Sequence, residues 1–119
     1  MTLNYFELSE FDSPDLPNSG VNMDSGFLSK LEIAREYAAI PFIITSGYRS
    51  QDHNAKVGGV PGSSHTKGYA ADIAVKSSRD RYIIIKALID AGFNRIGVAE
   101  SFIHVDNDPN KSGDVIWTY

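Results

Sequence analysis

The chain has 119 residues, of which 42% are hydrophobic, and its 11 basic and 15 acidic residues give a net charge of -4. This length suits one domain with one core, so we expect residues 1–119 to form a single domain. A net negative charge gives no electrostatic attraction to nucleic acid or anionic lipid, so we expect neither as a partner.

The N-terminal stretch MTLNYFELSEFDSPDLP has no basic start and no apolar segment of its own. It therefore predicts no secretory signal peptide. Nowhere does an apolar run approach the roughly 20 residues that cross a bilayer, so no membrane insertion is expected. We expect a monomer that is made in the cytoplasm.

The first predicted helix lies within residues 23–39, with Asp24 or Ser25 as its N-cap. Helical spacing predicts a buried apolar stripe made of Phe27, Leu28, Leu31, Ala34 and Tyr37. The helix should end before Pro41, and the β-rich run over residues 42–45 predicts a short strand that breaks at Ser46.

Residues 50–64, SQDHNAKVGGVPGSS, are rich in glycine and predict a surface loop with one turn of helix near residues 51–55. His53 lies in this polar stretch, and we interpret it as a solvated side chain. The following YAADIAV alternates like a strand, with Ala70, Asp72 and Ala74 on one face.

A second helix is predicted to start at the Ser77-x-x-Asp80 cap pattern and to stop at Gly92. Its apolar spacing predicts a buried face made of Tyr82, Ile85, Leu88 and Ile89. Strands over residues 95–99 and 102–105 should pair as a hairpin, and DVIWTY supplies a terminal strand. This order predicts an α+β fold: a small, mainly antiparallel sheet with helices packed on one side.

Three residues could hold a metal ion. Asp72 lies in an alanine-rich strand, where a buried carboxylate is costly unless it is paired or metal-bound. His65 ends the glycine-rich loop, and alternation places His104 and Asp106 on one strand face. Because cysteine is absent, a zinc site must use His, Asp and Glu, and two imidazoles with one carboxylate leave a fourth position open. The alternative is that Asp72 caps a turn and both histidines are hydrogen-bonded core groups.

Four stretches, SGYRS, HNAKVGG, SSHTKGYAADI and GFNRIGVAESFIHVD, resemble in this order the M15 family of zinc D-Ala-D-Ala carboxypeptidases, especially its short peptidoglycan-peptidase branch. The resemblance covers nearly the whole chain, and the signature S-x-H-x-x-G-x-A-x-D is intact from Ser63 to Asp72. It implies that His65, Asp72 and His104 bind zinc. It also implies that Arg49 binds substrate and stabilises the transition state, and we place Ser63 beside it as a substrate-binding residue.

The general base is the point at which this resemblance is weakest. Many relatives carry Glu or Asp three residues before the last metal ligand, where this chain has Ser101. We predict that Glu100, in the turn, is the base, with a solvated turn side chain as the alternative. Asp106 is the second candidate, either as base or as a partner that orients a ligand imidazole.

The resemblance implies zinc-dependent hydrolysis of amide bonds in peptidoglycan stem peptides, of carboxypeptidase or endopeptidase type. Such an enzyme would suit phage or prophage lysis, acting on the cell wall after release from the cytoplasm. The same scaffold also resembles the hedgehog signalling domain, so the competing hypothesis is a zinc-stabilised binding module without catalysis.

Overall fold

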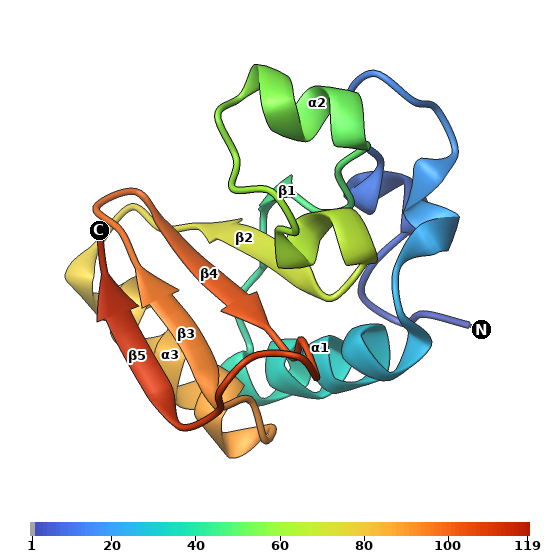
Figure 1. Ribbon diagram of the computed structural model, residues 1–119. Helices are drawn as coiled ribbons and strands as arrows, with labels where there is room; N and C mark the ends of the chain where they lie inside the picture. The colour runs from blue at the N-terminus through green and yellow to red at the C-terminus, as the bar shows by residue number, and fades with distance from the viewer. Residues whose placement is uncertain (1) are drawn as a thin grey trace.

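The computed structural model describes residues 2–119 (Figure 1). Over these residues, five strands form one sheet in the order β1-β2-β4-β3-β5. Their bounds are β1 Ile44–Ser46, β2 Ala70–Ala74, β3 Arg95–Val98, β4 Phe102–Asp106 and β5 Val115–Thr118. The β3–β5 pair is parallel and the other pairs are antiparallel, which confirms the predicted α+β class.

Helices α1, Ser25–Ala38, and α3, Ser78–Asp90, pack against each other and cover one face of the sheet (Figure 1). The short helix α2, Gln51–Lys56, and the 3-10 segment η3, Ser64–Lys67, lie in the segment that connects β1 to β2. This segment borders the other face of the sheet. Two further 3-10 segments, η1 Leu8–Phe11 and η2 Ser19–Asn22, precede α1. Within residues 2–119, no helix combines the length and the apolar character that crossing a membrane requires.

The predicted helix caps are present. An Asp24 oxygen accepts a hydrogen bond from the Phe27 amide at 2.8 Å, so Asp24 rather than Ser25 caps α1. Ser77 caps α3 by accepting from the Asp80 amide at 3.1 Å. Each such cap contributes about 1 kcal/mol to stability. Gly92 has φ 103°, a conformation that favours glycine, as expected for the residue that terminates α3.

Parts of the predicted buried faces are wrong. Tyr37, Tyr82 and Ile89 are 58%, 67% and 48% exposed, whereas Ile84 is buried. In α3, apolar residues occupy almost every position from 82 to 89, so spacing alone does not distinguish the buried face. The first strand is also displaced: β1 is Ile44–Ser46, and Phe42 packs in the core instead.

Alternation along β2 and β4 divides core residues from site residues. Ile73, Ile103 and Val105 lie in the hydrophobic core beneath the helices. Their neighbours Asp72 and His104, directly paired across the two strands, therefore point to the opposite face of the sheet. The polar groups of the site are thus held by strands whose other face is anchored in the core.

Candidate metal centre

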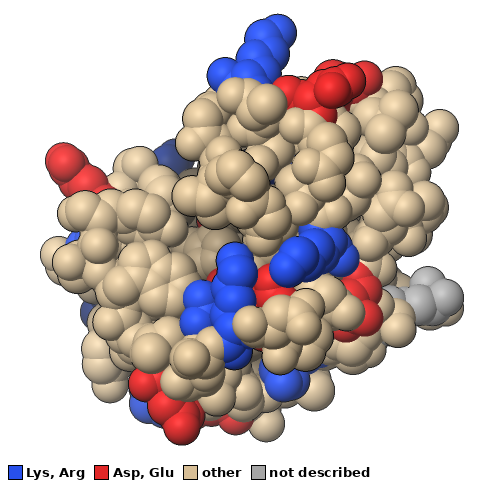
Figure 2. All heavy atoms as spheres, in the orientation of Figure 1, with Lys and Arg blue, Asp and Glu red and all other residues tan. Residues whose placement is uncertain are grey.

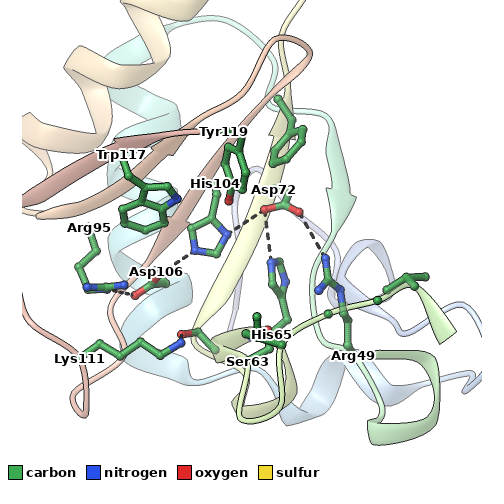
Figure 3. Close-up of a pocket in the computed structure, with 16 residues that line it drawn as sticks. Arg49, Ser63, His65, Asp72, Arg95, His104, Asp106, Lys111, Trp117 and Tyr119 are labelled. Carbon is green, nitrogen blue, oxygen red and sulfur yellow. Dashed lines mark hydrogen bonds and ion pairs between the residues drawn. The ribbon is translucent and has the colours of Figure 1, made fainter. Parts of the chain in front are cut away.

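The three predicted metal ligands converge at one point of that face (Figure 3). His65 comes from η3, Asp72 from β2 and His104 from β4. His65 Nε2 lies 3.3 Å, and His104 Nδ1 3.0 Å, from Asp72 Oδ1. One ligand atom from each residue falls within 4.8 Å of the others, and all three residues are buried. This arrangement can surround a single cation.

Local structure determines which nitrogen of His65 faces the centre. The Ser63 hydroxyl oxygen caps η3 by accepting a hydrogen bond from the His65 amide at 3.2 Å. His65 Nδ1 lies 2.8 Å from the Gly47 carbonyl oxygen. Because a carbonyl only accepts, Nδ1 carries a proton, and Nε2 is the nitrogen that faces Asp72 and could bind a metal ion once it has lost its own proton.

His104 is held in the opposite sense. Its Nδ1 faces Asp72, and its Nε2 lies 2.7 Å from Asp106 Oδ2. The other Asp106 oxygen accepts from Arg95 Nε at 2.7 Å. Asp106 therefore lies behind the imidazole of His104, away from the point at which the three predicted ligands meet.

The ionisation of the centre suits a cation. Burial acts to raise the pKa of Asp72, but hydrogen bonds from His104 and His65 outweigh it and hold this pKa well below its ordinary value. Burial acts to lower the pKa of His104, but hydrogen bonds to Asp106 and Asp72 raise it overall. Asp72 is therefore ionised at neutral pH, and positive charge is favoured beside it.

This donor set fits zinc. Two imidazole nitrogens and one carboxylate oxygen converge, which leaves a fourth tetrahedral position for water or substrate. Each histidine also has its second nitrogen bonded to an acceptor, as metal-binding histidines almost always do. His65, Asp72 and His104 are thus the residues that would hold the ion.

The centre forms part of a pocket of about 470 Å³ that Arg49, Ser63 and Asp106 also line. Arg49 Nη2 lies 3.6 Å from Asp72 Oδ2, on the side away from His104 (Figure 3). Its guanidinium is positioned by Ser46 Oγ at 3.1 Å and Asn54 Oδ1 at 3.3 Å. The structure therefore brings the predicted substrate-binding residues to the candidate metal ligands.

Glu100 lies elsewhere. It is exposed in the turn between β3 and β4 and is not among the residues that line the pocket. Arg81 Nη2 donates to its carbonyl oxygen at 2.7 Å, which ties the turn to α3. His104 lies within β4, on the strand that follows this turn, and it lines the pocket whereas Glu100 does not. His53, on α2, is also outside this pocket.

Several pocket residues were not anticipated from the sequence; they include Arg95, Lys111, Trp117 and Tyr119. The Trp117 ring centroid lies 5.5 Å from that of His104. Trp117 reaches the site because β5 pairs in parallel with β3, a long-range pairing for which the sequence carries no local signal.

Figure 2 shows Lys and Arg side chains interspersed with Asp and Glu near the centre of the face it presents.

A protein-family model described as Peptidase M15 matches residues 5–106. The chain therefore belongs to the M15 peptidases, and the family implies a hydrolase of the metallopeptidase kind. A search of curated proteins found no match to this chain.

Proposed function

We propose that the protein is a zinc-dependent peptidase that hydrolyses amide bonds in peptidoglycan stem peptides and reaches the cell wall after release from the cytoplasm. The observation that carries this proposal is the convergence of His65 Nε2, an Asp72 oxygen and His104 Nδ1 in a pocket beside Arg49. Membership of the M15 family supports the reaction class. The stem-peptide substrate rests on the resemblance of the sequence motifs.

The metal would be held by residues that the fold keeps rigid. His65 and His104 supply neutral nitrogens, and Asp72 supplies the negative charge that offsets part of the charge of the ion. When bound, zinc supplies Lewis-acid chemistry: it polarises an amide carbonyl and lowers the pKa of a water toward about 7. Hydrolysis in such a site needs no covalent bond between protein and substrate.

Arg49 would bind and orient the substrate. Its guanidinium faces the pocket beside Asp72, the residue whose charge a metal ion would partly neutralise. It can then give charge-assisted hydrogen bonds to a substrate carboxylate or to the oxyanion that develops on the scissile carbonyl. Ser63 lines the same pocket, and we keep it as a substrate-binding candidate.

A zinc-stabilised binding module is the second candidate function. One specific observation favours it: the pocket carboxylates are Asp72 and Asp106, both already engaged by histidine, and Glu100 is remote. A binding module needs no general base, whereas an enzyme of this class needs a group that takes the proton of the attacking water.

Mass spectrometry of products tests the proposal. Purified muropeptides of defined stem length are incubated with zinc-loaded protein, with His65→Ala as the control that lacks one metal ligand. Loss of a terminal D-alanine would identify a carboxypeptidase, and internal cleavage would identify an endopeptidase. Intact muropeptides after incubation with protein that retains one zinc per chain would reject the enzyme and favour the binding module.

A further inference from the structure

Arg95, on β3, reaches the predicted metal centre through a hydrogen bond to Asp106. Its Nε donates to Asp106 Oδ1 at 2.7 Å, and Asp106 Oδ2 lies 2.7 Å from His104 Nε2 (Figure 3). The three side chains form one chain of contacts that ends at a predicted metal ligand. The sequence motifs gave no role to Arg95.

Both oxygens of the Asp106 carboxylate have hydrogen-bond partners. Besides Arg95, the backbone amide of Asp108 donates to its Oδ1 at 3.2 Å. Asp106 is 1% exposed, so solvent barely reaches it. A general base must have an oxygen within reach of the attacking water, whereas both oxygens of Asp106 are buried and already face Arg95 and His104.

Arg95 is itself held in place from two sides. Its guanidinium carbon lies 5.1 Å from the centre of the Trp117 ring, within the range of a cation–π contact. Its Nη1 donates to the Ser112 carbonyl oxygen. Both partners come from the chain after β4, so the last strand and the loop before it support Arg95.

We propose that Asp106 and Arg95 are a positioning pair: Asp106 accepts the Nε2 proton of His104, so that Nδ1 is the atom offered to the metal, and Arg95 holds Asp106 in that orientation. The inference rests on the proposed zinc site, and it adds Arg95 to Asp106 as a residue that supports His104. Asp106 thereby leaves the list of candidate bases. Carboxylates that orient metal-binding imidazoles contribute about 10 to 100-fold to metal affinity or activity.

Zinc affinity tests the pair independently of peptidase activity. The zinc dissociation constant of each variant is measured by competition with a chromophoric chelator, and visible absorption of the cobalt(II) form reports the geometry of the ligands. Asp106→Asn cannot accept from both His104 and Arg95, so it should weaken zinc binding by about 10 to 100-fold and alter the cobalt spectrum. Arg95→Gln should weaken binding in the same direction by less.

A double variant tests whether Arg95 acts through Asp106, and a variant at Arg35 serves as the control. Because Arg95 acts through Asp106, adding Arg95→Gln to Asp106→Asn should cause little further loss. Arg35 is the control, since its guanidinium also lies over an aromatic ring, 4.7 Å from that of Tyr5, but outside the pocket. Arg35→Gln should leave zinc affinity and the cobalt spectrum unchanged.

Unchanged zinc affinity and an unchanged cobalt spectrum in Asp106→Asn, together with a 10² to 10⁴-fold loss of turnover, would overturn the proposal and make Asp106 the base. If Asp106→Asn does not fold, Arg95→Gln decides alone, and wild-type affinity in that variant overturns the pair. Wild-type protein that takes up no zinc would instead reject the proposed function.

Discussion

Arg49 shows how one side chain can serve the site without holding the metal. It is 17% exposed, and Ser46 and Asn54 hold its guanidinium facing the pocket. This geometry is suited to charge that develops on a substrate, because the donors are already in place before the reaction.

Arg49→Gln should therefore retain zinc but lose turnover by roughly 10² to 10³-fold, the usual cost of removing one oxyanion donor. The measurement is kcat/KM on a purified muropeptide together with the zinc content of the variant. Turnover equal to that of the wild type would exclude Arg49 from the reaction, and loss of zinc would make it a structural residue of the metal centre.

Glu100 gives the opposite case, since the sequence pointed to it and the structure places it outside the pocket. Glu100→Gln should leave turnover close to the wild-type value and change stability by no more than about 0.5 kcal/mol, as for most surface substitutions. Steady-state kinetics and urea unfolding measure both. A 10² to 10⁴-fold loss of turnover with zinc retained would return Glu100 to the role of base.

The sequence pointed to the three residues that converge in the candidate metal centre, but not to most of the residues around them. His65, Asp72 and His104 could be chosen because a carboxylate in an apolar strand requires a partner, and because alternation predicts which side chains share a face. The support from Arg95 could not be predicted, because its contact with Asp106 depends on how β3 lies against β4.

Among the elements, strand β3 lies between β4 and β5 and lets the last strand approach the candidate metal centre. Gly97 pairs with His104 on one side and with Trp117 on the other. A Cβ atom at Gly97 would lie 2.7 Å from Trp117 Nε1, closer than real Cβ contacts. The indole can therefore lie across Gly97 and approach His104 only because this residue has no side chain.

Gly97→Ala should displace the indole and cost about 1–3 kcal/mol, as overpacking commonly does. Trp117 is the only tryptophan in the sequence, so its fluorescence reports the displacement without interference. Emission and denaturant unfolding of the variant are compared with those of the wild type. Identical emission and stability would show that the indole does not occupy the position described.

Some structural features could be predicted from short stretches of the sequence. The caps at Asp24 and Ser77 and the β3–β4 hairpin depend on neighbouring residues, and the sequence predicted them. The parallel pairing of β5 with β3 joins Val115 to Arg95. It follows a turn of the chain that no local pattern specifies, which is why Trp117 was missed.

At the scale of the whole molecule, the sheet separates two tasks. Helices α1 and α3 cover one face and bury the core (Figure 1), while the candidate metal ligands from η3, β2 and β4 lie on the other face. An ion bound there would link three segments that are separate in the chain. Since it binds the folded state, it should also stabilise the fold, by an amount that grows with zinc concentration relative to its dissociation constant.

We propose that one zinc ion, bound by His65, Asp72 and His104, enables peptide hydrolysis. The most direct test is a titration of metal-free protein with zinc while muropeptide cleavage is followed by mass spectrometry. We expect no cleavage without metal and a rate that rises linearly and levels off at one zinc per chain. Cleavage that persists in a strong chelator, or no cleavage of any stem peptide by fully loaded protein, would contradict it.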